Sequence, residues 1–216
     1  QLTLASVQRH WSARTRGLMI ATPSNPTGTS VPPAELAAIG QWAQAHEAWR
    51  IVDEIYLNLS DPQPDGTPAP TALAADPGAC VINSFSKYFG MTGWRLGWAV
   101  VPPALVSAME RLAQNYYICA PTPAQLAALA CFTPESLAEC EARKREFLGR
   151  RALVLQGLQR IGLPVPVPPD GAFYVYIDVG ATGMDAMAFC QRALNEAHVA
   201  LTPGHDFGVR EAGRFV

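Results

Sequence analysis

Residues 17–56 read GLMIATPSNPTGTSVPPAELAAIGQWAQAHEAWRIVDEIY. The apolar run at 17–23 predicts a short buried strand that ends at a turn, because Pro, Ser, Asn and Gly follow it closely. The paired prolines at 32–33 suit the first turn of a helix, and the apolar residues after them recur at helical spacing. A second strand and its exit are predicted at 50–56. A strand, a helix and a strand in this order imply two parallel strands joined by a right-handed crossover.

The rest of the chain extends this α/β pattern. The sequence predicts strands at 80–86 and 96–101, a loop at 60–79, and helices at 103–115, 123–131, about 134–160 and 185–198. After Gly162, residues 163–180 alternate toward strand behind four prolines, and 199–204 predict a short strand and turn. We therefore expect a mostly parallel sheet with flanking helices in residues 1–155, as part of a large cofactor-binding domain. Residues 156–216 are expected to form part of a smaller α+β C-terminal domain.

The composition is that of an ordinary globular chain. Its 216 residues are 49% hydrophobic and 16% charged, with a formal net charge of −2. This balance gives no sign of disorder and no basic surface for nucleic acid or an anionic membrane. No apolar run approaches the ~20 residues that a bilayer span needs, and the first residues lack the pattern of a signal peptide. Because there is no initiator Met, Gln1 is not expected to be the natural start.

The five cysteines and four histidines show no metal-ligand or redox spacing. The cysteines at 80, 119, 131, 140 and 190 form no C-x-x-C pair, and the histidines form no H-x-x-x-H pair. We therefore expect reduced thiols, a cytoplasmic protein and no metal site.

Four short polar clusters follow or precede the predicted strands. They are Asn25-Pro-Thr-Gly28, Asp53-Glu-Ile-Tyr56, Ser84-Phe-Ser-Lys87 and Gly93-Trp-Arg95-Leu-Gly97. Taken singly, each is typical of an ordinary turn, a helix cap, a surface lysine or a surface ion pair. Ligands of open α/β sheets bind beyond the carboxyl ends of the strands, so the clusters can converge there although they are far apart in sequence.

In order and spacing, these clusters resemble those of the fold-type-I aminotransferases, the family that includes aspartate aminotransferase. The matching stretches are ATPSNPTGT at 21–29, IVDEIY at 51–56 and SFSKYFGMTGWRLGW at 84–98, and the likeness continues through GAFYVYIDV and LTPGHDFG. The resemblance covers essentially the whole chain. It implies the fold of the pyridoxal-phosphate transferases. It also implies an enzyme that moves an amino group between an amino acid and a 2-oxo acid by a ping-pong mechanism.

The resemblance implies catalytic roles for three residues. Lys87 is implied to form a Schiff base with the aldehyde of pyridoxal phosphate and, once the substrate has displaced it, to act as the base at Cα. Asp53 is implied to face the ring nitrogen, because a carboxylate there keeps the nitrogen protonated. Tyr56 is implied to donate a hydrogen bond to the phenolic oxygen of the cofactor.

Four further residues are implied as cofactor ligands. Asn25 joins Tyr56 as a donor to the phenolic oxygen. Ser84 and Ser86 offer hydroxyl groups to the phosphate, and Arg95 offers it a planar guanidinium. For Phe173, in the GAFY stretch, two interpretations stay open: it faces the site from the small domain or, as is favoured, it packs in the core.

The resemblance also implies parts beyond these residues. The family is typically homodimeric, has a longer N-terminal part with an aromatic ring that stacks on the cofactor, and places a substrate-carboxylate arginine directly after a sequence like the one ending at Val216. Neither nucleic acid nor a membrane is expected as a partner.

Two alternatives stay open. Lys87 and Asp53 would serve a β-elimination lyase acting on sulfur amino acids equally well, since only the fate of the carbanion differs. The other alternative is an aminotransferase-like, cofactor-sensing domain of a transcription regulator, for which a basic helix-turn-helix in an N-terminal part would be the sign.

Overall fold

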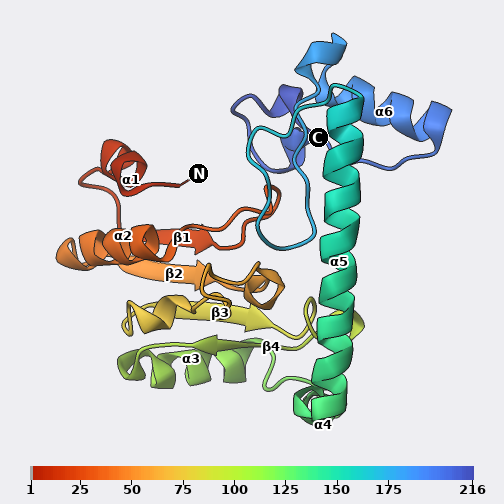
Figure 1. Ribbon diagram of the computed structural model, residues 1–216. Coiled ribbons are helices and arrows are strands. Elements are labelled where there is room, and N and C mark those ends of the chain that lie inside the picture. The colour runs from red at the N-terminus through yellow and green to blue at the C-terminus, as the bar shows by residue number, and fades with distance from the viewer. Residues whose placement is uncertain (1) are drawn as a thin grey trace.

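The computed structural model describes residues 2–216, which contain a four-stranded sheet (Figure 1). Its strands are β1 (Gly17–Ala21), β2 (Trp49–Asp53), β3 (Cys80–Ser84) and β4 (Gly97–Val100), in that spatial order. β1, β2 and β3 run parallel, with Ala21 beside Asp53 and Asp53 beside Ile82, while β4 is antiparallel to β3. The mostly parallel α/β sheet expected from the sequence is therefore confirmed.

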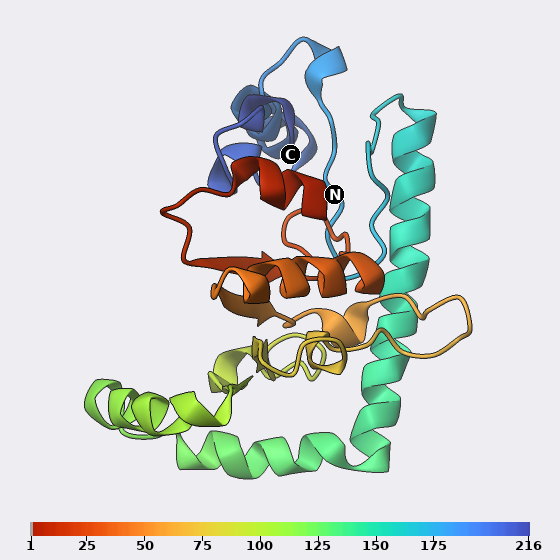
Figure 2. The ribbon, with the colours of Figure 1, turned by 90° about the vertical axis from the view of Figure 1, so that its left-hand side faces the viewer.

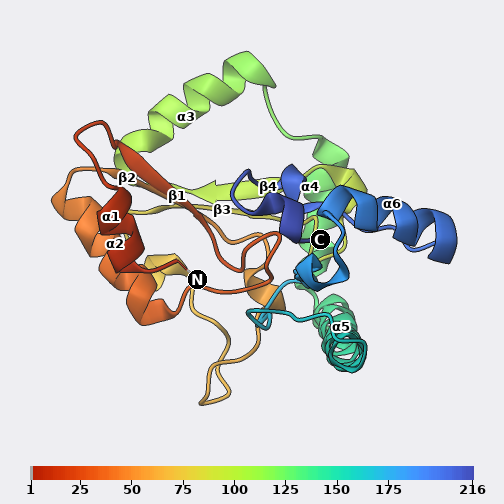
Figure 3. The same cartoon turned by 90° about the horizontal axis from the view of Figure 1, so that it is seen from above.

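Six α-helices among residues 2–216 accompany the sheet. They are α1 (Leu4–His10), α2 (Pro33–Ala45), α3 (Pro103–Tyr116), α4 (Thr122–Leu129), α5 (Pro134–Arg160) and α6 (Ala186–Ala197). Short 3-10 helices lie at Leu57–Leu59, Ala72–Ala74, Thr92–Trp94, Ala130–Phe132, Gly180–Thr182, Gly204–Asp206 and Ala212–Arg214. The view from above shows α2 and α3 on opposite sides of the sheet (Figure 3). In this part of the chain, no helix combines the length and the apolar character that crossing a membrane would require.

The carboxyl ends of β1, β2 and β3 point toward α5, a helix of 27 residues that runs past that edge of the sheet (Figure 1). The chain enters α5 at its lower end, directly after α4 (Figure 2). α5 continues without a break across residues 155 and 156, where the sequence predicts a domain boundary. The division into residues 1–155 and 156–216 stays a prediction.

The first helices pack on the β1 side of the sheet around one apolar cluster. The cluster consists of buried side chains from α1, β1, the loop before α2, and α2 itself: Val7, Ile20, Val31 and Ile39. The sequence analysis did not predict α1. Its start is fixed by a capping box around Thr3, whose side chain accepts a hydrogen bond from the Ser6 backbone.

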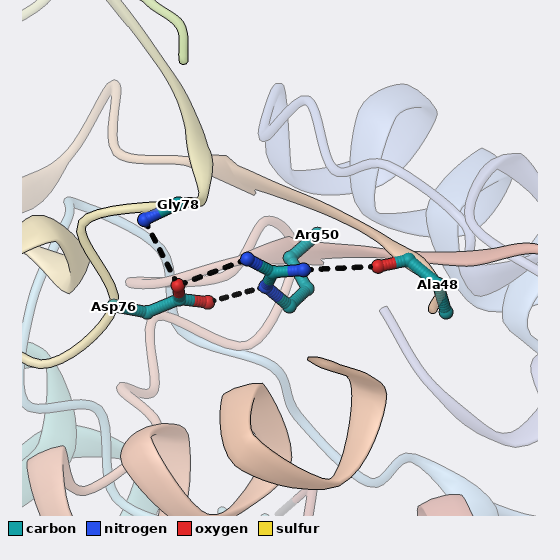
Figure 4. A network of polar contacts seen from close by, with 4 residues as sticks. All are labelled: Ala48, Arg50, Asp76 and Gly78. Atoms are coloured by element: carbon teal, nitrogen blue, oxygen red, sulfur yellow. Dashed lines mark hydrogen bonds and ion pairs between the residues drawn. The ribbon is translucent and has the colours of Figure 1, made fainter. Parts of the chain in front are cut away.

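An ion pair fixes the first half of β2 to the chain that leads into β3 (Figure 4). Arg50 Nε donates to Asp76 Oδ2 at 2.5 Å, and Arg50 Nη2 donates to Asp76 Oδ1 at 3.1 Å. The Gly78 N–H donates to the same Oδ1 at 3.1 Å, and Arg50 Nη1 donates to the Ala48 carbonyl at 3.1 Å. These bonds hold the start of β2, and Asp53 is at the other end of the same strand.

Two predicted strands are absent from residues 2–216. Residues 163–180 and 199–204 form no strand, and only an isolated antiparallel bridge joins Asp178 to Phe215. Both predictions were therefore wrong. Proline has no N–H for a sheet ladder, and four prolines precede residue 170. The backbone instead makes scattered bonds, such as the reciprocal pair between Ile177 and Val216 at 2.8 and 3.0 Å.

Candidate active site

Asp53 is the last residue of β2 and lies at the carboxyl edge of the sheet. Bonds on both sides hold its backbone, since the Thr22 N–H donates to the Asp53 carbonyl at 3.0 Å and the Glu54 N–H donates to the Ile82 carbonyl at 2.8 Å. Asp53 Oδ1 accepts a hydrogen bond from the Ile55 N–H at 3.0 Å. The carboxylate is thus fixed where a ligand of an open α/β sheet would meet it.

The neighbouring carboxylate of Glu54 is used differently. Glu54 is 2% exposed, and its oxygens accept hydrogen bonds from Thr71 Oγ1 at 2.8 Å and from the Ala72 N–H at 2.6 Å. Burial is the main reason that the pKa of Glu54 is raised above its ordinary value. Glu54 therefore ties the loop after β2 to the sheet, which leaves Asp53 as the carboxylate available to a ligand.

Tyr56 is buried next to a second tyrosine that comes from far along the chain. Its side chain is 5% exposed, and its hydroxyl oxygen lies 2.5 Å from that of Tyr174, 118 residues away. The two rings meet edge to face, with centroids 5.4 Å apart. Burial, followed by the hydrogen bond with Tyr174, raises the pKa of Tyr56. Tyr56 therefore keeps its proton and remains a hydrogen-bond donor at neutral pH.

Lys87 follows β3 and extends its amine over two aromatic rings. Lys87 Nζ lies 5.7 Å from the ring centroid of Tyr56 and 5.6 Å from that of Phe173. These distances are typical of cation–π contacts, which hold the amine near Tyr56. Among residues 2–216, Lys87 forms no ion pair.

Phe173 lies beside Lys87 and Tyr56 at the candidate site. It was expected mainly to pack in the core, but its side chain is 41% exposed and its ring meets that of Tyr56 edge to face at 5.5 Å. These contacts favour the alternative in which Phe173 faces the candidate site over packing in the core. The only sequence signal was the aromatic pair Phe173–Tyr174 directly after Gly171-Ala. Its proximity to Lys87 depends on tertiary structure.

Ser84 and Ser86 lie on the same side of the chain that leaves β3. Their hydroxyl oxygens are 2.9 Å apart, and Ser84 Oγ also lies 3.1 Å from the Leu96 carbonyl. The Ser86 N–H donates to Ser84 Oγ at 3.0 Å. Phe85, between them, is buried in the apolar cluster beneath. The turn that follows β3 thus brings the two hydroxyls together while Phe85 packs in the core.

Arg95 is connected to this serine pair through Thr92. Thr92 Oγ1 donates to the Ser86 carbonyl at 2.6 Å, and the Thr92 carbonyl accepts a hydrogen bond from Arg95 Nη1 at 2.9 Å. Arg95 has a left-handed backbone with φ of 56° and an exposed side chain. The rest of its guanidinium is therefore available to an anion. The sequence analysis did not identify Thr92.

Asn25 lies in a turn that docks on the segment carrying Phe173 and Tyr174. The Gly28 carbonyl of this turn accepts hydrogen bonds from the N–H groups of Asp170 and Gly171, at 3.0 and 2.9 Å. The Asn25 side chain is exposed, and within residues 2–216 no hydrogen bond joins it to another predicted site residue. The structure thus brings the Asn25 turn to the site without a direct link from its side chain.

The chemical types of these groups fit pyridoxal phosphate. An amine, a carboxylate and a phenol come from Lys87, Asp53 and Tyr56, and they suit an aldehyde, a ring nitrogen and a phenolic oxygen respectively. Two hydroxyls and a guanidinium suit a phosphate. These groups lie at or just after the ends of β2 and β3, or just before the start of β4.

Comparison with known proteins gives a consistent result. Residues 1–216 match the family model "Aminotransferase class I and II". The chain is 46% identical over 202 residues to a valine–pyruvate aminotransferase of Mycobacterium tuberculosis, covering 93% of this chain and 51% of that protein. It is 38% identical over 201 residues to an arginine–pyruvate transaminase of Pseudomonas aeruginosa, covering 93% of this chain and 50% of that protein. The chain thus spans about half the length of these relatives.

Solved structures show the same likeness. A crystal structure of an aminotransferase from Mycobacterium tuberculosis superposes with a TM-score of 0.93 at 43% identity, over 100% of this chain and 55% of that one. A Thermus thermophilus aspartate aminotransferase with maleate superposes with a TM-score of 0.88 at 33% identity, over 98% of this chain and 54% of that one.

Proposed function

Because the chain belongs to the class I and II aminotransferases, which use pyridoxal phosphate, we propose that the full-length protein transfers an amino group between an amino acid and a 2-oxo acid. One observation carries the proposal. Lys87 Nζ lies over the rings of Tyr56 and Phe173, beside groups that follow the carboxyl ends of β2 and β3. The influence of Asp53 on the pKa of Tyr56 supports the same proposal, because it requires the carboxylate to be near the tyrosine.

Lys87 performs the covalent and proton-transfer work. When bound, pyridoxal phosphate supplies an aldehyde that captures an amine and a ring that withdraws electrons from the captured group. Lys87 Nζ is the amine that holds this aldehyde before substrate arrives. As a free amine, Lys87 Nζ would be the base that takes a proton from the substrate Cα and the acid that gives it back. The two aromatic rings hold Nζ near Tyr56 by cation–π attraction.

Asp53 and Tyr56 set the electronic state of the bound ring. The Asp53 carboxylate holds a proton on the ring nitrogen, and its hydrogen bond from the Ile55 N–H at 3.0 Å orients it for that purpose. The Tyr56 hydroxyl donates a hydrogen bond to the phenolic oxygen. The side-chain amide of Asn25 donates a second hydrogen bond to the same oxygen. Ser84, Ser86 and Arg95 bind the phosphate and so anchor the ring relative to Lys87.

The finer features of the reaction are part of the same proposal. Pyruvate is the first 2-oxo acid to test, because two relatives at 46% and 38% identity have it in their names. We further propose a homodimer, with residues 156–216 contributing to a small C-terminal domain. A cytoplasmic location, expected from five cysteines that are all unpaired, stays a prediction.

The test uses the full-length protein with pyridoxal phosphate. Borohydride reduction and peptide mapping are expected to find the cofactor fixed on Lys87. Lys87→Ala should abolish this fixation and transamination together. The matched control is Lys144→Ala, which removes the chain's other lysine, on α5, and it should retain both.

The amino donor is identified from the same sample. Bleaching of the cofactor band by particular amino acids, and its recovery with pyruvate, would establish transamination. Release of pyruvate and ammonia without an acceptor would instead indicate a β-elimination lyase. A band that no amino acid changes would favour a cofactor sensor, and the absence of any bound cofactor would refute the proposal.

A further inference from the structure

We infer that Tyr174 is a positioning residue of this site, which orients the hydroxyl of Tyr56 and strengthens it as a donor to the cofactor's phenolic oxygen. This inference rests on the proposed function. It concerns a residue that is not among the predicted cofactor ligands, and it starts from the short contact between the two hydroxyl groups.

The contact is close and rigidly held. The Tyr56 and Tyr174 hydroxyl oxygens are 2.5 Å apart, and the rings cross at 81°. Tyr56 is 5% exposed, so bulk water cannot replace Tyr174 as its partner. On the other side, the segment of Tyr174 is anchored to the Asn25 turn, because Gly28 accepts the N–H groups of Asp170 and Gly171.

Proton counting gives the contact a direction. A phenol carries one proton and can also accept, so only one hydroxyl of the pair donates to the other. If the Tyr56 hydroxyl donates its hydrogen bond to the cofactor oxygen, it has no proton left for Tyr174. The hydrogen bond between the two tyrosines then requires Tyr174 to donate to Tyr56. A donor chain then runs from Tyr174 through Tyr56 to the cofactor, and hydrogen bonds in such a chain strengthen one another.

Three titratable groups and one aromatic ring surround Tyr56. The titratable groups that face it are Lys87 over its ring, Asp53 at the end of β2 and Tyr174 itself. Burial is the main cause of the raised pKa of Tyr56, so its hydroxyl keeps the proton with which it donates a hydrogen bond. Phe173 covers the ring at 5.5 Å and offers no competing acceptor.

The experiment is a pH titration of the cofactor's absorption band in the full-length protein loaded with pyridoxal phosphate. A donor to the phenolic oxygen stabilises its deprotonated form and so lowers the pH midpoint of the band. Tyr174→Phe is therefore expected to raise the midpoint by roughly 0.5 pH unit, and Tyr56→Phe by more. In the double variant, loss of Tyr174 should add nothing to the effect of Tyr56→Phe, because the chain is already broken.

The control is Tyr176→Phe, two residues further on. Tyr176 stacks on Phe215 with ring centroids 4.9 Å apart and belongs to a different contact. It should leave the midpoint unchanged. Tyr174→Phe removes only the hydroxyl and keeps the ring that packs against Tyr56, so the variant isolates the contribution of the hydroxyl.

The outcomes separate the two proposals. If the wild-type protein forms no cofactor band, the proposed function fails. If the band forms but Tyr174→Phe titrates at the wild-type midpoint, the inference about Tyr174 is overturned while the proposed function stands. An equal shift from Tyr174→Phe in the presence and absence of the Tyr56 hydroxyl would also overturn it, since the effect would then not pass through Tyr56.

Discussion

Arg50 and Asp76 form a bidentate ion pair between β2 and the chain before β3, with side chains only 15% and 14% exposed. Arg50 lies near the start of the strand that ends at Asp53. The pair therefore fixes the position of the strand from the end opposite the site (Figure 4). Only Ile51 and Val52 separate Arg50 from Asp53, so a displaced strand start would be transmitted to the carboxylate.

Asp76→Asn is expected to destabilise the full-length protein by about 3 kcal/mol, because it leaves the Arg50 charge largely buried without a counter-charge. Urea unfolding measures the loss. Glu196→Gln is the matched control, since it breaks an ion pair with Arg192 whose side chains are 60% and 63% exposed. That pair should contribute about 0.5 kcal/mol or less. Equal losses in the two variants would contradict the role assigned to burial.

Gly28→Ala is expected to loosen the contact between the Asn25 turn and the segment of Tyr174. Gly28 has φ of +65°, and an added Cβ would lie 2.8 Å from both Pro169 Cβ and the Tyr174 carbonyl. Gly66→Ala separates the two effects, because Gly66 has φ of +82° with nothing within 4 Å of the added atom. Backbone strain alone should cost about 1 kcal/mol in Gly66→Ala. The clash in Gly28→Ala should add about 2 kcal/mol more.

Cofactor affinity provides the second measurement for these glycine variants. Gly28→Ala should weaken binding of pyridoxal phosphate, because Tyr174 and Phe173 move with the turn, whereas Gly66→Ala should not. Unchanged affinity in Gly28→Ala would show that the turn does not hold the aromatic side of the site.

Much of the sheet side of the site could be predicted from sequence, because the signals are local. The strand ends at Asp53 and Ser84 follow from apolar runs that stop at polar clusters. Parallel pairing then places them at one edge, and the structure has Asp53 beside Ile82, two residues before Ser84. Lys87 follows within the same cluster, so it was found with them.

The aromatic side of the site could not be predicted in the same way. Tyr174 is 118 residues from Tyr56, and no local pattern encodes their meeting. Residues 163–180 alternate like a strand, but their prolines leave no continuous ladder, so the alternation reflects packing of single side chains. Phe173 was accordingly expected in the core, and Thr92 was overlooked because its role is a backbone-linked contact between Ser86 and Arg95.

Asp53→Asn is expected to lower transamination by about 100-fold or more, because the amide cannot stabilise the positive ring nitrogen. The bound cofactor should remain fixed on Lys87 by borohydride. Glu54→Gln is the matched control, one residue along, since Glu54 bonds to Thr71 and Ala72 and not to the site. It should change activity only slightly. A larger activity loss in Glu54→Gln than in Asp53→Asn would exchange the roles of the two carboxylates.

Glu54 should give folding stability a specific pH dependence. Burial raises the pKa of Glu54 above its ordinary value of 4.5, so the folded protein holds this proton at pH values where the unfolded chain has released it. The stabilising contribution is therefore fully present below about pH 4.5 and is lost as pH rises through the raised pKa. Glu54→Gln removes the titration and keeps a neutral side chain of similar size.

The free energy of unfolding, measured in urea from about pH 4.5 to 8, should fall with rising pH more in the wild-type protein than in Glu54→Gln. The Gln oxygen can still accept a hydrogen bond from the Ala72 N–H, but the Gln NH2 group is a donor and cannot accept one. The free energy of unfolding of the variant should therefore be lower than that of the wild type at about pH 4.5 and should approach it as pH rises. Glu139→Gln, an exposed residue of α5 in an i,i+4 pair with Arg143, controls for the change in net charge. If the difference in free energy of unfolding between the wild type and Glu54→Gln stays constant over this pH range, Glu54 is ionised in the folded and unfolded states alike. Thr71 and Ala72 would then stabilise a buried carboxylate and not a neutral acid.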